Sequence, residues 1–417
     1  MNNIIMESGV RSQESGVRSQ ESGVRSQESG VRSQESGVRS QESGVRSQES
    51  GVRPVVSFCI PVYNNAEAAV KIVNGILVSE DTRFEVIACD DASNDDAQEL
   101  LSQIHDSRFR YVRNPHNLGA LKNWLHSLEL GRGQWLYFVI GRDRINGEHI
   151  PKLIDFLNYA DKNGITLIQD GYSKQPQQII YSGIDAMIHF LDFWHPTGSI
   201  YKRELFEAIP CKEYYFTHAD TYPENYIRRD MLLKGKGAAI MTGVYDSPSP
   251  IIDRAKVKST VEHSMKQEDM YYAPRRRTGQ TLEIIDMIDS TQGIFSVNEA
   301  DRFFRQKFYA LLGTVSSGWS GTCSDFKWQS HYGQKVRHVG IREMIGNIIT
   351  TYHTTKRHLM SEGTLTPSRQ RIMYCSLAKI FVYLPVKEAA KTILKPLGLW
   401  DVLKSIKLRI TGRSHQN

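Results

Sequence analysis

The sequence predicts an α/β protein with a mostly parallel sheet and helices on both of its faces, followed by a mainly helical region. Between residues 54 and 250, short apolar runs alternate with segments of helical spacing, which is typical of parallel βαβ units. From residue 281 onward apolar residues recur mostly with helical spacing. A low-complexity repeat precedes both regions. We therefore predict three parts, at residues 1–53, 54–250 and 251–417.

The first part consists almost wholly of a seven-residue repeat. The unit ESGVRSQ occurs six times from Glu7, and a partial copy ends at Arg53. A coiled coil needs two apolar positions in each heptad, and this unit has only its valine. Each unit also holds one Gly and two Ser, which favour a helix poorly, and it has no net charge. Such a segment buries too little surface to offset the entropy of ordering, so we expect residues 1–53 to be disordered.

Strands and helices alternate in the second part. We expect strands at the apolar runs 55–60, 84–89, 109–113 and 134–140, and helices at 65–79, 95–105 and 120–130. The loops that follow the four strands are PVYNN, DDASND, NPHNLG and GRDRI. In a parallel sheet these loops meet outside the carboxyl ends of the strands, where ligands bind.

Composition excludes several classes of protein. The five cysteines are odd in number, widely spread and without a CxxC pair, which indicates a reducing compartment and argues against a disulfide framework or a zinc site. We expect neither a signal peptide nor a membrane span, since no uninterrupted apolar run reaches about 18 residues. Residues 376–417 hold eight Lys/Arg and two Asp/Glu, which accounts for the net charge of +6. This basic tail lacks a recognised reader fold, so we expect no nucleic-acid partner.

The polar loops lack the commonest phosphate-binding signatures. Neither GxGxxG nor GxxxxGK[ST] follows the first strand, so no dinucleotide site or P-loop is indicated. The acids of DDASND either cap the next helix or accept hydrogen bonds from a base or ribose. Asp143, between Arg142 and Arg144, either lies in a solvated turn or holds Mg²⁺ or Mn²⁺ together with substrate phosphates.

Taken in order, four segments resemble family 2 glycosyltransferases of the GT-A fold. They are VSFCIPVYNN, FEVIACDDASND, NPHNLGALKNW and GQWLYFVIGRDRI, and the resemblance covers about residues 55–245. It implies transfer of a sugar from a nucleotide diphosphate sugar, which we expect to be UDP-linked, with inversion. The acceptor would be a glycan or a lipid-linked glycan in surface polysaccharide synthesis. The alternative is a catalytically impaired relative that binds sugar nucleotides.

The resemblance also assigns donor-side roles at the strand ends. The donor-binding residues would be Pro61, Val62 and Tyr63 around the base, Asp91 bonded to the base, and Asn117, Gly119 and Lys122 beside the nucleotide. The family's DxD metal motif falls on residues 141–143, where Asp143 keeps the last acid and Gly141 replaces the first. Either Mg²⁺ or Mn²⁺ on Asp143 binds the diphosphate, or Arg142 or Arg144 neutralises it directly, or the site has decayed.

An inverting transfer also needs a general base beside the acceptor hydroxyl. The segment 193–205 resembles the acceptor side of the family, with His195 and Thr197 as candidate contacts. Glu224 matches the position of the family's base, since it follows a proline and opens a helical stretch, and Asp220 is the reserve candidate. The alternative role of Glu224 is that of a first-turn acid interacting favourably with the helix dipole.

The third part carries no motif that we can tie to chemistry. We predict a basic loop at 271–280, YYAPRRRTGQ, which is either a lid over the substrates or a solvated turn. Helices are expected at 281–290, 300–315 and 341–360. The basic tail is either a helix packed on the core or a peripheral anchor on an anionic membrane. We therefore expect a cytoplasmic protein, free or at the inner face of the cell membrane.

Overall fold

The computed structural model describes most of the chain after the repeat. The described residues are 53–141, 143–171, 178–192, 195–210, 212–218, 222–247, 266–291, 293–326, 329 and 333–394. The predicted disorder of the repeat, Arg142, Asp220 and the basic tail beyond residue 394 lie outside them. The predicted boundary at residue 250 falls in such a segment too, so the division there stays a prediction.

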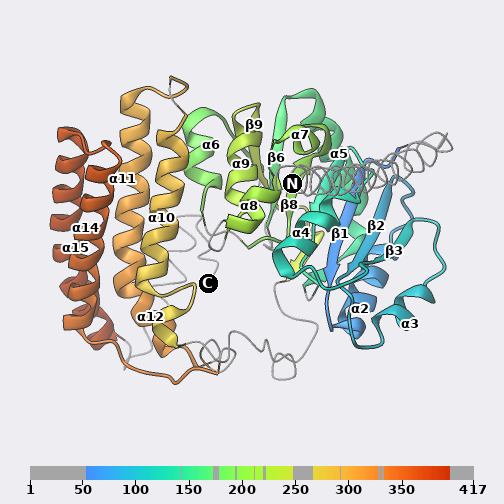
Figure 1. Ribbon diagram of the computed structural model, residues 1–417, viewed down its shortest axis with the longest axis horizontal. Coiled ribbons are helices and arrows are strands. Elements are labelled where there is room, and N and C mark those ends of the chain that lie inside the picture. The colour runs from blue at the N-terminus through green and yellow to red at the C-terminus, as the bar shows by residue number, and fades with distance from the viewer. Residues whose placement is uncertain are drawn as a thin grey trace, which may run out of the picture. The chain divides into compact units, whose positions relative to one another are not determined.

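A mixed sheet is the centre of the region after residue 53 (Figure 1). Among the described residues it has eight strands in the order β3-β2-β1-β4-β8-β6-β9-β7. The strands are β1 (Val56–Val62), β2 (Phe84–Asp90), β3 (Phe109–Arg113), β4 (Trp135–Phe138), β6 (Ile165–Asp170), β7 (Gln178–Tyr181), β8 (Ser199–Lys202) and β9 (Lys236–Ile240). Only β8 and β7 run antiparallel to their neighbours, so the sheet is mostly parallel, as predicted. A separate pairing joins β5 (Arg144–Ile145) to β10 (Tyr245–Ser247).

The register of the first three strands brings the motif loops together. Val62 lies opposite Asp90 in the parallel pair β1–β2, and Asp90 lies opposite Arg113 in the parallel pair β2–β3. The chain therefore leaves all three strands at one level of the same sheet edge. The four strands predicted for this region are confirmed, with bounds that differ by at most a few residues.

Helices cover both faces of the sheet, because successive side chains of β1 point to opposite faces and pack against helices on each. Phe58 and Ile60 belong to one hydrophobic cluster with α2 and α5, whereas Cys59 belongs to a second cluster with α4, α6 and α9. The helices of this region are α2 (Ala66–Leu77), α3 (Ala97–Ser102), α4 (Ala120–Glu129), η1 (Gly147–His149), α5 (Ile150–Lys162), α6 (Gly183–Phe190), α7 (Arg203–Ala208), α8 (Lys212–His218) and α9 (Glu224–Leu232). The three helices predicted between the first four strands are confirmed.

The chain after residue 266 is helical (Figure 1). Its elements are η3 (Gln267–Asp269), α10 (Pro274–Asp289), α11 (Val297–Gly313), η4 (Thr314–Gly318), α12 (Trp319–Ser324), α14 (Ile341–Ser361) and α15 (Pro367–Leu394). The buried guanidinium of Arg369 on α15 bonds both carboxylate oxygens of Asp289 on α10, at 2.5 and 2.6 Å. Lys307 on α11 donates to the carbonyl of Ile188 on α6 at 2.9 Å, which joins the helices to the sheet region.

One local prediction for this region is wrong. The basic segment 271–280 is not a loop throughout, because α10 begins within it at Pro274. Proline is favoured at the first position of a helix, where its fixed φ fits and its missing N–H would have no partner. The three arginines that follow therefore lie in the first turn of a helix.

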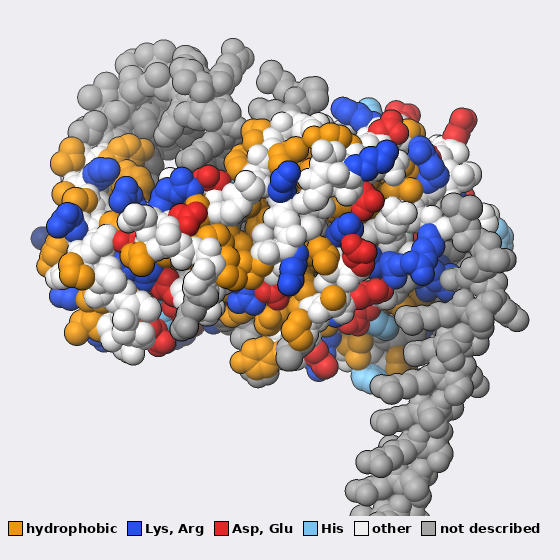
Figure 2. Space-filling model, turned by 90° about the horizontal axis from the view of Figure 1, so that it is seen from above, with side chains coloured by type: hydrophobic (Ala, Val, Ile, Leu, Met, Phe, Trp, Pro, Cys, Tyr) orange, Lys and Arg blue, Asp and Glu red, His pale blue; other side chains and the backbone are white. Residues whose placement is uncertain are grey.

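Two properties of the described surface bear on possible partners. On the face shown in Figure 2, Lys and Arg side chains are interspersed with Asp and Glu, and do not gather into one basic patch. Among the helices that the structure describes, none combines the length and the apolar character that a membrane crossing requires.

Candidate functional site

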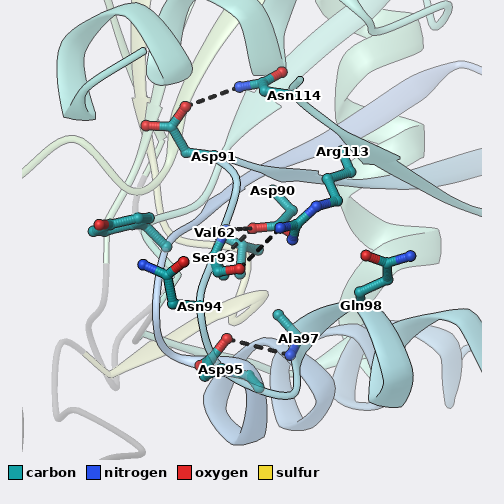
Figure 3. Close-up of polar contacts among 12 residues, drawn as sticks. Val62, Asp90, Asp91, Ser93, Asn94, Asp95, Ala97, Gln98, Arg113 and Asn114 are labelled. Carbon is teal, nitrogen blue, oxygen red and sulfur yellow. Dashed lines mark hydrogen bonds and ion pairs between the residues drawn. The ribbon is translucent and has the colours of Figure 1, made fainter. Parts of the chain in front are cut away.

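The loop after β2 is held in shape by its own acids (Figure 3). Asp90 is fully buried and accepts hydrogen bonds from the hydroxyl of Tyr111 at 2.6 Å and the guanidinium of Arg113 at 2.5 Å. Asp95 accepts the N–H groups of Ala66 and Ala97 at 2.9 and 3.2 Å, so it ties the starts of α2 and α3 together. These two acids are structural, and they fix the backbone on either side of Asp91.

Asp91 joins the loop after β2 to the loop after β3. Its carboxylate, 1% exposed, accepts the side-chain amide of Asn114 at 3.0 Å and the N–H groups of Leu118 and Gly119 at 2.7 and 2.9 Å. Gly119 has a φ of +87°, a conformation that other residues rarely adopt. The structure thus brings together the predicted donor residues Asp91 and Gly119, and Asn117 accepts the same N–H of Gly119 at 2.9 Å.

The loop after β1 reaches the same edge. Asn64, with a φ of +50°, accepts the N–H of Asn94 at 2.8 Å, and the amide of Asn65 donates to the carbonyl of Gly141. Of the three residues predicted around the base, Val62 is buried and Pro61 is half-buried, whereas Tyr63 is 48% exposed. Tyr63 therefore has the largest surface to offer a ligand.

Asp143 lies at the end of β4 in a buried polar cluster. It is 1% exposed and accepts a hydrogen bond from the hydroxyl of Thr197, which itself accepts the N–H of Ile140 at 2.9 Å. Nδ1 of His195 lies 3.5 Å from the Asp143 carboxylate and 3.1 Å from the hydroxyl of Tyr245. The predicted metal-binding acid and both predicted acceptor-side residues therefore meet at one place. The alternative that Asp143 lies in a solvated turn is wrong, because its side chain is buried.

Two predicted cations lie at the surface instead. Lys122 is exposed, and Arg144 is 63% exposed and pairs with Asp246 at 3.5 Å across β5 and β10. An exposed pair of this kind contributes roughly 0–1 kcal/mol, so a ligand can replace Asp246 at little cost.

The Asp143 cluster supplies few ligands for a metal. Among the described residues, no group of three His, Cys, Asp or Glu side chains could hold an ion. Asp143 offers a carboxylate, which is the type of ligand that Mg²⁺ and Mn²⁺ favour, and His195 offers an imidazole. A divalent cation would fit here only with further oxygen ligands, such as those of a diphosphate.

Glu224 opens α9, as predicted, and its side chain is completely buried. Neither of its carboxylate oxygens has a hydrogen-bond partner within the described part of the chain. Burial raises the pKa of Glu224 to about 7, and the charge of Arg228 offsets part of this rise. A buried carboxylate without a partner costs free energy, and polar groups left in this state are found preferentially at functional sites.

A buried network that the sequence analysis missed links the helix of Glu224 to the cluster around Asp143. Arg228, also on α9 and fully buried, donates to the hydroxyl of Ser199 at 2.8 Å and to Oε1 of Gln169 at 3.2 Å. The amide of Gln169 then donates to the carbonyl of Thr197 at 3.1 Å. One signal was available, because Arg228 follows Glu224 by one turn on the apolar face of the helix.

A cavity on the other side of α9 differs from this site. It has a volume of about 460 Å³ and lies between α9, α10 and α14. Its polar groups bond one another, since Tyr226 donates to Glu283 at 2.6 Å and His358 lies 2.9 Å from Asp286. It therefore offers a ligand fewer unsatisfied groups than the buried face of α9 does.

Part of the chain is similar to known glycosyltransferases. Residues 57–217 match the model of the family "Glycosyl transferase family 2". An uncharacterized protein of Mycobacterium tuberculosis (strain CDC 1551 / Oshkosh) is 36% identical over 92 residues, which is 22% of this chain and 29% of that protein. The UDP-Glc:alpha-D-GlcNAc-diphosphoundecaprenol beta-1,3-glucosyltransferase WfaP of Escherichia coli is 29% identical over 103 residues, which is 25% of this chain and 41% of that protein.

A solved structure is similar to this chain with a low TM-score. The crystal structure of residues 1–349 of S. aureus TarS in complex with UDP-GlcNAc has a TM-score of 0.44 at 14% identity, over 72% of this chain and 91% of that one. At this score the likeness supports no conclusion about the present chain.

The fold, the motif loops and the family match agree: residues 57–217 are similar to family 2 glycosyltransferases and supply most strands of a mostly parallel sheet with helices on both faces, which a helical region follows. The resemblance of the four sequence segments is thereby confirmed. The chain spans only part of the length of the curated relatives it matches, 29% and 41% in the two cases above.

We predict that Thr197→Val destabilises the protein, because it removes the donor to Asp143 and the acceptor for the N–H of Ile140. Loss of these two hydrogen bonds should lower the free energy of unfolding by about 1–3 kcal/mol, measured by urea denaturation. Thr197→Ser keeps the hydroxyl and serves as the control. Equal stability of Thr197→Val and the wild type would contradict this account of the cluster.

Proposed function

We propose that the chain is an inverting glycosyltransferase that moves a sugar from a nucleotide diphosphate sugar to a glycan or lipid-linked acceptor. The observation that carries this proposal is Glu224, a buried carboxylate without a hydrogen-bond partner among the described residues, on a helix whose polar network continues to Asp143. Within a family 2 domain, an acid at this place is suited to act as the general base. Asp220, which lies outside the described residues, stays the reserve candidate for this role.

The donor would bind at the edge formed by the loops after β1, β2 and β3. Asp91 would accept a hydrogen bond from the base through a carboxylate that backbone N–H groups already hold in place and that is 1% exposed in this structure. Exposed Tyr63 would stack on the base, and Asn117 and Lys122 would lie beside the nucleotide. The printed name of the E. coli relative specifies UDP-Glc as its donor, which supports UDP as the nucleotide here.

Asp143 would lie at the diphosphate. A divalent cation, Mg²⁺ or Mn²⁺, would be held by Asp143 and His195 and would stabilise negative charge on the diphosphate. Arg142 or Arg144 is the alternative source of positive charge, and Arg144 forms a weak surface pair with Asp246. Thr197 and Tyr245 orient the acid and the imidazole in either case.

The proposed reaction is a single displacement. The acceptor hydroxyl attacks the anomeric carbon of the donor sugar as its proton passes to Glu224. The bond between that carbon and the diphosphate oxygen breaks on the opposite face, and the nucleoside diphosphate leaves, so the configuration inverts. Burial of Glu224 excludes water and favours the protonated form, which makes its carboxylate a stronger base than an exposed glutamate.

A catalytically impaired sugar-nucleotide binder is the second candidate function. It is favoured by Gly141, which stands where the family has the first acid of its metal motif. Binding of UDP without measurable transfer or hydrolysis of UDP-sugars would identify this case.

We further propose a role in polysaccharide synthesis in the cytoplasm, at the inner face of the cell membrane. The printed name of the E. coli relative specifies a diphosphoundecaprenol-linked acceptor. In the middle of α15 and within the basic tail, Phe381, Val382 and Tyr383 are 38, 72 and 41% exposed. Apolar and basic groups together favour an anionic membrane surface. Failure of the full chain to float with vesicles rich in phosphatidylglycerol would remove this proposal.

We predict that Glu224→Gln lowers turnover by roughly 100-fold or more while UDP binding is retained. In the wild type kcat/KM should rise with pH through about 7, because the base must be ionised and burial raises the pKa of Glu224 to about 7.

The free energy of unfolding of the Glu224→Gln variant separates a loss of folding from a loss of the base. Ionised Glu224 is disfavoured by burial above its ordinary pKa of 4.5, so Glu224→Gln should not lower the unfolding free energy at pH 8. Full activity of the variant would move the role to Asp220 or exclude it.

We predict that Asp91→Ala weakens UDP binding by roughly 10-fold or more in calorimetric titration, because it removes the acceptor for the base and loosens residues 114–119. Asp95→Ala is the matched control, since it also removes an acceptor of two backbone N–H groups from the same loop. An equal effect of both substitutions on UDP affinity would mean that Asp91 acts only through the fold of the loop.

We predict that EDTA stops turnover and that Mn²⁺ or Mg²⁺ restores it, with Asp143→Asn behaving like EDTA treatment. If arginine neutralises the diphosphate instead, EDTA has little effect and Arg144→Ala raises the donor KM. Donor binding that none of these treatments changes would show that this strand end is not the diphosphate site.

A further inference from the structure

We propose that Arg228 is a positioning residue that keeps Glu224 ionisable. Three neutral acceptors hold the Arg228 guanidinium one helical turn from Glu224, so that the two side chains do not form a direct ion pair. This inference rests on the proposed role of Glu224 as the base. It assigns a function to a buried cation that takes no direct part in the reaction described above.

The placement of Arg228 is unusual for an arginine. Its side chain is fully buried, and it follows Glu224 by four residues, so both lie on the same face of α9. Charged side chains are rarely buried unless an opposite charge or several hydrogen bonds compensate them. The compensation here has two separate sources.

The first source is a set of uncharged acceptors from three elements. The Arg228 guanidinium donates to the Ser199 hydroxyl at 2.8 Å, to Gln169 Oε1 at 3.2 Å and to the carbonyl of Phe190 at 3.3 Å. The Ser199 hydroxyl also donates to Gln169 Oε1 at 3.1 Å, so β8 and β6 hold their acceptors in a fixed arrangement.

The second source is the charge of Glu224 itself. No hydrogen bond joins the two side chains, and both carboxylate oxygens of Glu224 lack a partner in the described part of the chain. The Arg228 charge still lowers the pKa of Glu224 against the larger effect of burial. Direct contact with a guanidinium depresses a carboxyl pKa by roughly 1–3 units, which would make Glu224 a weak base near neutral pH.

Few other charges act on Glu224 from the elements packed around it. Tyr201 on β8 is buried and lies near both Glu224 and Arg228, and burial raises its pKa to about 12, so it stays neutral. Arg277 on α10 lies 3.4 Å from the hydroxyl of Tyr222, two residues before Glu224. On α6, His189 stacks on the ring of Tyr181. Within the described residues, Arg228 is thus the cation whose effect on Glu224 is resolved.

One of these acceptors also connects Arg228 to the proposed donor side of the site by hydrogen bonds. Gln169 accepts from Arg228 and donates to the carbonyl of Thr197, whose hydroxyl donates to Asp143. The positions of the proposed base and of the acid at the diphosphate are therefore fixed by one continuous network.

Two substitutions should move the pH profile of kcat/KM in opposite directions. Arg228→Met fills a similar volume without charge, so the apparent pKa for activity should rise by about one unit, with activity recovering at pH 9. Ser199→Ala removes the shortest anchor and lets the guanidinium approach Glu224, so the apparent pKa should fall. A purely structural role for Arg228 would lower activity equally at every pH.

Arg229→Met is the matched control. Arg229 neighbours Arg228 on α9 but pairs with Asp230 at 2.7 Å on the other side of the helix, so its loss should leave the profile unchanged. An unchanged apparent pKa in Arg228→Met, or in Ser199→Ala if Arg228→Met does not fold, would overturn the inference. This failure is distinct from failure of the proposed base, which would appear as an active Glu224→Gln variant.

Discussion

The hydrogen bonds of Thr197 and Gly198 connect the two halves of the sheet, the one that ends with β4 and the one that contains β6 and β9. Thr197 donates to Asp143 and accepts from Ile140 beyond β4, while the N–H of Gly198 donates to Phe138 and its carbonyl accepts from Asp170 on β6. Gly198 has a φ of +88°, and a Cβ at this position would lie 2.0 Å from the carbonyl oxygen of Asp170. Only glycine fits between β4 and β6 here, and the strand β8 that follows can then insert antiparallel between them.

This connection explains why the proposed donor and acceptor sides of the site meet. The loops after β1, β2 and β3 come from the parallel half of the sheet, whereas Glu224 and Arg228 precede β9 in the other half. Asp143 and His195 come from the segments after β4 and before β8, where the halves join.

The acids on the two sides of the sheet differ in their surroundings. Burial acts against ionisation of Asp90, but hydrogen bonds from Ser93 and Tyr111 outweigh it and hold the pKa of Asp90 below its usual range. Among the described residues no side chain donates to Glu224, and burial raises its pKa.

Much of this arrangement followed from the sequence, because it depends on local patterns. Alternating strands and helices predicted the parallel half of the sheet, and the strand ends predicted which loops meet. The network of Gln169, Ser199 and Arg228 could not be predicted in this way, since it needs three distant segments and an antiparallel strand inserted among parallel ones. The pairing of Arg144 with Asp246 likewise spans 102 residues. The basic segment was mistaken for a loop because its charges outweighed the helix-starting signal of Pro274.

The most direct test of the account is a crystal structure of the chain with UDP and MnCl₂, recorded with anomalous scattering from manganese. We expect the uracil beside Asp91 and Tyr63, the diphosphate beside Asp143, and the Glu224 carboxylate facing the place where the donor sugar would lie. A manganese peak within about 2.5 Å of an Asp143 oxygen would identify the metal as the partner of the diphosphate. UDP bound away from these strand ends, or a protein layer separating Glu224 from the diphosphate, would contradict the proposed site.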